Sequence, residues 1–499
     1  MAEQPRVEPG TGATPKADST LAGRALWLSF AAATTGTFMV NVDASVVNVA
    51  LPVMQHEFGL PIGALQWVIT AYLLVITGLL PITGHLADIW GRKRVFSSGI
   101  TIFVVGSLAC ALAPGFAGLV AARVLQGIGG AIIMANVMAI IGLIFPVEMR
   151  GRALGLIGSV VAGGTLAGPP LGGLLTAWFG WRSVFWINLP FGLWGLWGTW
   201  RYLPRFRPVP GMRLGSLDWL GAGLFAAGTT ALQFGLADLH RLYGWALLGL
   251  TAGVTWIFLS VEQKSSHPLI PLRLFRVRAF SSNLLSGMAY WMLMMFPAFL
   301  MPFYLQTELR LPVSVIGLSL VPQALAMILV SPWGGRWTDR AGVLVPGRVG
   351  LGLFFVADLW LATIPAHPPL WEVWAILALI GAAAGLYSSP NNAAVLSAVS
   401  KPEMGVASSL MATQRNLGRA VGVAVASILL SVAWLAMGLG SNPSHSAPQY
   451  PQWFLAGFHV VFAVGLLVVA AAWLTLVAPS TNSSSERTSQ GMAGLRKKL

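Results

Sequence analysis

The stretch Gly84-His-Leu-Ala-Asp-Ile-Trp-Gly-Arg-Lys-Arg94 separates two long apolar runs, at 65–86 and 95–113. A shorter version of it, Gly335-x-x-x-Asp339-x-x-Gly342, follows another apolar run later in the chain at a constant offset. In the first copy the two glycines permit tight turns and the aspartate offers a negative cap. A duplicated polar loop at matching places in two apolar halves predicts a helical membrane protein with a six-plus-six arrangement.

The composition of the chain excludes the common classes of soluble protein. Of the 499 residues, 56% are hydrophobic and only 9% are charged, whereas a soluble domain has about 25% charged residues. Soluble enzymes, transcription factors and secreted scaffolds are therefore not expected.

The net charge of +14 does not indicate a nucleic-acid partner, because the basic residues lie between apolar runs and form no single basic face. The single cysteine, Cys110, and the lack of CxxC and His-x-x-His pairs argue against a disulfide, a metal site or another cofactor. No nucleotide-binding G-x-x-x-x-G-K-[ST] loop is present, so ion coupling must supply any transport work.

Apolar runs interrupted by turn residues and charges predict an all-α polytopic fold with fourteen membrane-spanning helices. They are expected at 25–50, 65–86, 95–113, 117–145, 153–177, 183–203, 218–236, 244–261, 280–305, 314–337, 348–365, 371–394, 405–437 and 453–478. The thirteenth exceeds the roughly 20 residues that a bilayer requires, so its first turns are expected to project into the cytoplasm.

The distribution of Lys and Arg predicts the orientation. With the N-terminus inside, 24 of the 30 basic residues fall in inner segments, three in outer loops and three within spans. Since positively charged loops face the cytoplasm, both termini are expected there, with the chain in the inner (cytoplasmic) cell membrane. The predicted divisions are a disordered tail (1–22), a six-helix bundle (23–205), a linker with two extra helices (206–279), a second six-helix bundle (280–478) and a disordered tail (479–499).

Several motifs together resemble the major facilitator superfamily. The stretch 84–94 is similar to its signature loop, except that Ile89 replaces a usual Arg, and Leu119-x-x-x-Arg123-x-x-Gln126-Gly127 is similar to its fourth-helix motif. The antiporter motif of the fifth helix is matched at Gly155, Gly164, Gly168, Pro169, Gly172 and Gly173. Five further segments are similar to the fourteen-helix drug:H⁺ antiporters of the EmrB/QacA type. They are Asn41-Val-Asp43, Val47–Pro52, Trp181–Pro190, Pro271–Arg276 and Phe280.

This resemblance implies two six-helix bundles plus two inserted helices, and a transporter rather than an enzyme. The implied function is alternating-access export of an amphipathic, drug-like organic solute in exchange for protons. The implied partners are that solute, protons and the lipid bilayer, with the protein acting as a monomer; the sequence names neither the solute nor a periplasmic adaptor. Two alternatives remain open, namely a proton symporter that imports a nutrient and a membrane sensor or scaffold that transports nothing.

Asp43 and Arg123 are the principal candidates for proton coupling. A carboxylate within a span costs about 2.5–3.5 kcal/mol on insertion scales. Helix directions place Asp43 and Arg123 at similar depth in the outer half, so Arg123 is a possible partner when Asp43 is ionised. The alternatives are a structural aspartate with helix-end hydrogen bonds and an arginine that reaches the outer interface.

The glycines of the fifth-helix motif and the residues of the gate loop can also be explained by structural roles alone. Gly164, Gly168 and Gly172 recur every four residues and allow close approach of a neighbouring helix, which plain packing also requires. In the loop, Asp88 is expected to cap the positive N-terminal end of the thirteenth helix and hold an inner gate shut. Arg92, Lys93 and Arg94 can also be explained as the positive charges that keep this loop on the cytoplasmic side. The repeat positions Gly335 and Asp339 are assigned to the gate with a smaller role.

Three further groups complete the candidate sites. Asp358, within the eleventh predicted helix, is either a second protonation or cation-recognition site or a packing partner. Arg415 and Arg419 are one turn apart and either neutralise an acid or extend toward the interface. An adaptable substrate pocket is expected along the ninth helix and its surroundings, although lipid contact or core packing explains the same pattern; its members are Trp291, Met295, Phe299, Gln306 and Arg415.

Overall fold

The computed structural model describes residues 23–206, 208, 218–237, 242–264, 270, 272–399, 404–440 and 449–476. The predicted tails, 1–22 and 479–499, lie outside these ranges. The regular elements within them are helical, as the apolar runs predict. Their bounds are α1 Arg24–Phe58, α2 Ile62–Trp90, α3 Arg92–Ala111, α4 Phe116–Ile144, α5 Val147–Phe179, α6 Ser183–Trp186, α7 Asn188–Tyr202, α8 Trp219–Ala237, α9 Leu242–Lys264, the 3₁₀ helix η2 Leu272–Arg276, α10 Arg278–Thr307, α11 Val313–Ser319, α12 Val321–Ala341, α13 Leu344–Leu361, α14 Leu370–Ser397, α15 Met404–Ala436 and α16 Tyr450–Thr475.

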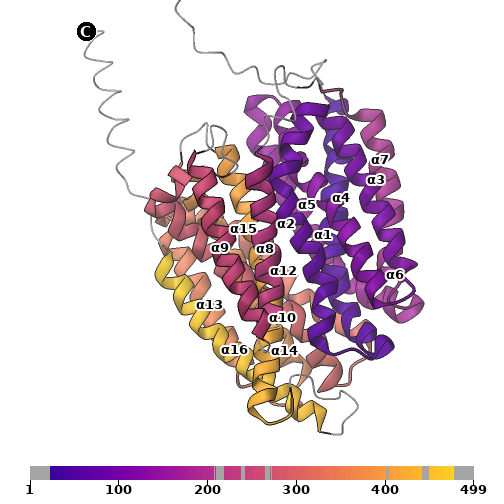
Figure 1. Ribbon diagram of the computed structural model, residues 1–499, viewed down its shortest axis with the longest axis vertical. Helices are drawn as coiled ribbons and strands as arrows, with labels where there is room; N and C mark the ends of the chain where they lie inside the picture. The colour runs from indigo at the N-terminus through magenta and orange to yellow at the C-terminus, as the bar shows by residue number, and fades with distance from the viewer. Residues whose placement is uncertain are drawn as a thin grey trace, which may run out of the picture.

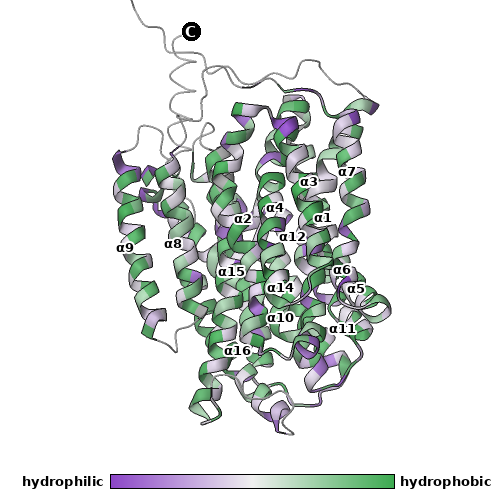
Figure 2. Cartoon of the chain, turned by 45° about the vertical axis from the view of Figure 1, so that its right-hand side comes forward, coloured by the Kyte–Doolittle hydropathy of each residue, from purple (hydrophilic) through white to green (hydrophobic). Residues whose placement is uncertain are grey.

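The length and apolar character of these helices are those of a multi-pass membrane protein. Within the described ranges, 11 helices are long and apolar enough to cross a membrane. They do not include α5, α7 or α8, so the full set of fourteen spans stays a prediction. Figure 2 shows apolar residues along most of the length of the helices, with many of the hydrophilic residues near the two ends of the molecule.

Two of the predicted spans are interrupted in the structure. The segment predicted at 183–203 is divided into α6 and α7, and the segment predicted at 314–337 is divided into α11 and α12. Each break is close to a proline, Pro190 in the first turn of α7 and Pro322 at the start of α12. A proline lacks the N–H that would continue the hydrogen-bond ladder of the preceding helix.

The helices form two groups that face each other. Helices α1 to α7 pack among themselves, with α1 against α5 and α7, and α4 against α2 and α3. Helices α10 to α16 form the second group, in which α14 packs on α12 and α13, and α10 packs on α15 and α16 (Figure 1). The two groups meet chiefly where α2 contacts α15 and where α5 contacts α11.

Helices α8 and α9 pair with each other at the edge of the molecule. The pair packs on α2 and α15 through α8, while α9 forms the outer edge in Figure 2. On α9, Trp245 and Trp256 expose most of their surface. These are large apolar side chains, and in a bilayer they face lipid.

The duplicated loop is more helical than predicted. Gly84 lies inside α2, and Gly335 and Asp339 lie inside α12, so none of the three is in a loop. The chain turns instead at the last glycine of each copy, Gly91 with φ +90° and Gly342 with φ +74°. Glycine is favoured there because other residues rarely adopt a positive φ.

Candidate functional site

Asp43 lies at the centre of a buried hydrogen-bond network inside the first helix group. Its side chain is completely buried, and its Oδ2 accepts a hydrogen bond of 2.6 Å from Arg123 Nη1. Its Oδ1 accepts two amide hydrogen bonds, each of 2.8 Å, from Gln126 Nε2 and Asn188 Nδ2. Three donors converge on one carboxyl group, so the arrangement fits its ionised form, which can only accept.

Arg123 is held by several groups besides Asp43. Its Nε donates to the carbonyl of Val68 at 2.8 Å, and its Nη1 also donates to Gln126 Oε1 at 2.6 Å. The Tyr72 ring faces the guanidinium at 4.1 Å. These contacts stabilise the arginine in the bundle interior and leave it in the wall of a cavity.

Ser107 supports the two amides from behind. Its Oγ accepts hydrogen bonds from Asn188 Nδ2 at 2.8 Å and Gln126 Nε2 at 3.1 Å, and donates to the carbonyl of Phe185 at 3.0 Å. The network thereby joins α1, α3, α4, α6 and α7. Because polar groups are expensive in a membrane interior unless they are paired, this network is a fixed feature of the bundle.

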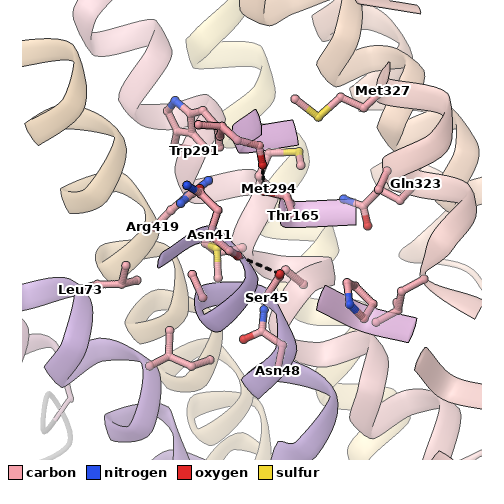
Figure 3. A pocket seen from close by; sticks show the side chains of 18 of the residues that line it. Asn41, Ser45, Asn48, Leu73, Thr165, Trp291, Met294, Gln323, Met327 and Arg419 are labelled. Atoms are coloured by element: carbon pink, nitrogen blue, oxygen red, sulfur yellow. Dashed lines mark hydrogen bonds between the residues drawn. The ribbon is translucent and has the colours of Figure 1, made fainter. Parts of the chain in front are cut away.

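A cavity of about 210 Å³ lies between the two helix groups, beside Arg123. In Figure 3, Arg419 and Trp291 lie together on one side of it, Gln323 and Met327 on another, and Ser45 on α1 faces the space between them. The remaining lining residues are Asn41, Ala44, Asn48, Ile69, Tyr72, Leu73, Arg123, Val161, Thr165, Pro169, Met294, Met295, Ala298, Leu320, Ala324 and Ile328. The wall is therefore mainly apolar, with a few amides and hydroxyls and two arginines.

The predicted pocket residues divide into two groups. Trp291 and Met295 line the cavity, whereas Phe299, Gln306 and Arg415 are not part of the lining. Phe299 is completely buried and packs edge-on against Phe303 at 5.7 Å. Successive residues of one helix point in different directions, so only part of the aromatic and methionine run can face the cavity.

Asp358 is separate from the Asp43 network and from the cavity lining. It lies near the C-terminal end of α13, almost fully buried, and its carboxyl oxygens have no hydrogen-bond partner in the part of the chain that the structure describes. A Cβ at Gly465 of α16 would lie 2.7 Å from its Oδ2, which shows how closely α16 packs on it.

The gate residues are tied together locally. Arg92 Nη2 forms an ion pair of 2.5 Å with Asp88 Oδ1 across the turn, and Arg92 Nη1 reaches Asn136 on α4 at 3.5 Å. Lys93 donates hydrogen bonds to the carbonyl of Trp200 at 3.0 Å and to the carbonyl of Leu203. Both carbonyls lie at the C-terminal end of α7. The side chain of Asp339 lies outside the described part of the structure.

The glycines of α5 make two different close contacts. Gly164, Gly168 and Gly172 face α1, where a Cβ at Gly172 would lie 2.6 Å from the Val46 carbonyl. Gly173 faces α11, and a Cβ on it would lie 2.9 Å from Gly317 Cα. Helix α5 therefore touches one helix of its own group and one of the opposite group, on neighbouring faces.

Glu308, directly after α10, was not singled out by the sequence. It is 3% exposed and forms no ion pair among the described residues. Burial raises the pKa of Glu308 to about 7 because the charged form is poorly solvated. Its Oε1 has no hydrogen-bond partner in that same part of the chain.

The family follows from comparison with known proteins. The model of the Major Facilitator Superfamily matches residues 33–423 and 279–497. The chain belongs to the major facilitator superfamily. This superfamily consists of transporters and not of enzymes, which agrees with the expectation from the resemblance.

Curated relatives of this facilitator are named as transport and resistance proteins. The riboflavin transporter RibZ of Clostridioides difficile is 32% identical over 80% of this chain and 87% of its own. The multidrug resistance protein Stp of Mycobacterium tuberculosis is 32% identical over 85% and 79%. The cephamycin export protein CmcT of Amycolatopsis lactamdurans is 33% identical over 91% and 92%.

Solved structures of other facilitators share the fold. A bacterial homologue of the human lysosomal transporter Spinster, in an inward-facing conformation, has a TM-score of 0.66 at 17% identity. The match covers 97% of that chain and 91% of this one. A D-xylose–proton symporter has a TM-score of 0.63 at 13% identity, over 98% of its chain and 91% of this one. At these identities the likeness concerns the fold alone.

Sequence reasoning named Asp43 and Arg123 but assigned no role to Gln126, Asn188, Ser107 or Tyr72. Gln126 had a usable signal, because residues three apart lie on one face of a helix and Gln126 is three residues after Arg123. Asn188 had no such signal, since it reaches Asp43 from a helix 145 residues further along the chain.

Proposed function

We propose that this facilitator is a proton-coupled antiporter that exports small organic solutes, of the fourteen-helix drug:H⁺ type. The observation that carries the proposal is the buried Asp43–Arg123 pair next to the cavity between the two helix groups. The names of the relatives, among them the cephamycin export protein and a methylenomycin A resistance protein, support export as the direction. We further propose the cytoplasmic membrane, with both termini inside, and action as a monomer.

The geometry suits a proton carrier because the carboxyl group that would take the proton is paired directly with an arginine in the cavity wall. A proton on Asp43 removes the charge that Arg123 neutralises, and Arg123 also borders the cavity. Breaking a buried charge pair costs about 3–5 kcal/mol, which is similar to the few kcal/mol that separate two conformations of a protein. Protonation is therefore able to change the relative populations of the two transporter states.

In this proposal Asp358 is a second protonation site and the turn at Asp88 is part of the inner gate. Asp88 is paired with Arg92 in the structure, and residues 400–403, which precede α15, lie outside the described ranges. The contact proposed between Asp88 and the N-terminal end of α15 thus stays a prediction. Gly155 and the other motif glycines of α5 are proposed to keep this helix close to its neighbours during transport.

The proposal is tested with Asp43→Asn in proteoliposomes. The transported compound is first selected in a growth-inhibition panel that contains a cephamycin and methylenomycin A, in a host without its own pumps. The wild type is expected to accumulate it against a gradient when a pH difference is imposed, and solute entry should raise the luminal pH. Asp43→Asn should lose accumulation by at least tenfold while retaining solute–solute exchange.

Glu57→Gln is the matched control. Glu57 forms an exposed pair of 2.7 Å with Arg182 and accepts a hydrogen bond from Trp181, away from the cavity lining. It should transport like the wild type. Full gradient-driven accumulation by Asp43→Asn would contradict the role of Asp43, and a fall in luminal pH on solute entry would indicate symport instead.

A further inference from the structure

The charge of the cavity wall is unbalanced. Two arginines line it, and one of them, Arg123, is neutralised by Asp43. The other is Arg419 on α15. It forms no ion pair or hydrogen bond within the described chain, and no Asp or Glu is among the described residues that line the cavity.

Arg419 is held in place by an aromatic ring. Its guanidinium carbon lies 4.5 Å from the centre of the Trp291 ring, and Figure 3 shows the two side chains together at the cavity wall. Arg415, one turn earlier on α15, lies 6.0 Å from the same ring and has no carboxylate partner among the described residues either. Two positive charges thus surround one tryptophan beside the cavity.

Contact with the ring leaves the guanidinium able to bind an anion. Arginine has five N–H donors in a planar fork, and those of Arg419 make no hydrogen bond or ion pair with the described residues. A carboxylate in that plane would accept two parallel hydrogen bonds. An unpaired charge inside a membrane protein is expensive, so an anionic ligand bound to Arg419 would offset that cost.

The rest of the wall fits an apolar body attached to that anion. Met294, Met295 and Met327 supply adaptable contacts, and Trp291 supplies an aromatic face. Neutral polar groups are placed at Ser45 and Gln323. They can hydrogen-bond to a solute without adding charge.

We infer that the cavity selects organic anions, an apolar or aromatic body with a carboxylate that binds Arg419, over neutral and cationic analogues. This inference rests on the proposed export function for the identity of the cavity as the solute site. It assigns solute recognition to Arg419 and leaves the Asp43–Arg123 pair for the proton.

The test measures binding to the purified full chain in detergent, at one pH and without a gradient. The probes are 2-naphthoate, 2-naphthamide and 2-naphthylmethylammonium, which share a bicyclic body and differ in charge. Calorimetric titration should give at least tenfold tighter binding for the naphthoate than for the amide, and the weakest binding for the ammonium compound. Because no transport is measured, a failure of proton coupling does not affect the result.

Variants then assign the preference to Arg419. Arg419→Gln should lower naphthoate affinity to that of the amide, and Arg419→Lys should retain part of the preference. Arg348→Gln is the matched control, because Arg348 also faces a tryptophan, Trp473 at 4.8 Å, but is outside the cavity lining; it should bind like the wild type. The thermal unfolding midpoint of each variant verifies folding.

Two results would overturn the inference. One is naphthoate binding no better than the amide or the ammonium compound to the wild type. The other is an unchanged preference in a folded Arg419→Gln. If Arg419→Gln does not fold, Arg419→Lys decides: its preference for the naphthoate should be weaker than that of the wild type, and an undiminished preference would overturn the inference.

Discussion

The carboxyl groups of Asp43 and Glu308 illustrate two opposite environments for a buried acid. Asp43 accepts three hydrogen bonds, one of them from a guanidinium. Glu308 has no ion pair within the described residues, and burial raises its pKa to about 7. The first environment compensates the charge, whereas the second disfavours it.

Glu308 therefore predicts a pH dependence of stability. Its pKa is higher in the folded protein than the ordinary value of 4.5, so the folded state holds the proton more tightly. The stabilisation that comes from Glu308 should be complete below about pH 4.5 and should be lost as the pH rises to about 7. Glu308→Gln should remove this decline and be more stable than the wild type above pH 7, by on the order of 1 kcal/mol.

Thermal unfolding in detergent between pH 5 and pH 8 measures the effect. Glu372→Gln serves as the control, because the Glu372 carboxylate accepts a hydrogen bond of 2.8 Å from Trp360 and its loss should not remove the decline. The same fall in melting temperature in Glu308→Gln as in the wild type would show that another group is responsible.

Helices α5 and α11 are in backbone contact across the two halves of the molecule. A Cβ at Gly317 would collide with the Pro169 carbonyl and would lie 2.9 Å from Gly173 Cα. Both obstacles belong to the main chain of α5, so no side-chain rotation can remove the collision. Figure 2 shows α11 beside α5 at the same end of the molecule as α6.

Gly317→Ala is therefore predicted to separate the halves at this end. Spin labels on the adjoining ends of α5 and α11 should report a longer mean distance, by about 2 Å or more, as the packed core resists overfilling. Gly352→Ala on α13 is the control, since a Cβ there meets nothing within 4 Å. An unchanged distance distribution in Gly317→Ala would mean that the contact does not hold the halves together.

In the whole molecule, the α8–α9 pair is peripheral to the cavity. The described residues that line the cavity come from α1, α2, α4, α5, α10, α12 and α15, with Leu320 at the break before α12. None of them comes from α8 or α9. The exposed tryptophans of α9 and its position at the edge in Figure 2 place the pair toward lipid. It is thus expected to support the bundle and not to bind solute.

Cysteine labelling checks this placement. The native Cys110 is buried, which keeps the background low. The transported compound should slow labelling of Asn48→Cys in the cavity wall several-fold and leave Gly223→Cys on α8 unchanged, where a Cβ meets nothing within 4 Å. Protection of Gly223→Cys by that compound would place α8 in the transport path.

What the sequence could determine was local along the chain. Apolar runs must form helices in a membrane because lipid offers no partner for a free backbone N–H or C=O, and the structure has helices at the predicted runs. Helical spacing also places Arg123 and Gln126 on one face. Pro190 and Pro322 are present in the sequence, but only the structure showed that the predicted spans at 183–203 and 314–337 are divided just before them.

The tertiary structure decided which helices meet and which side chains point inward. Asn188 reaches Asp43, Gly173 meets Gly317, and Arg419 lines the cavity whereas Arg415 does not. These facts depend on the rotation and tilt of each helix, which follow from the packing of all its neighbours together. No periodicity within a single segment contains that information, because a helix of given sequence can present any of its faces to a partner.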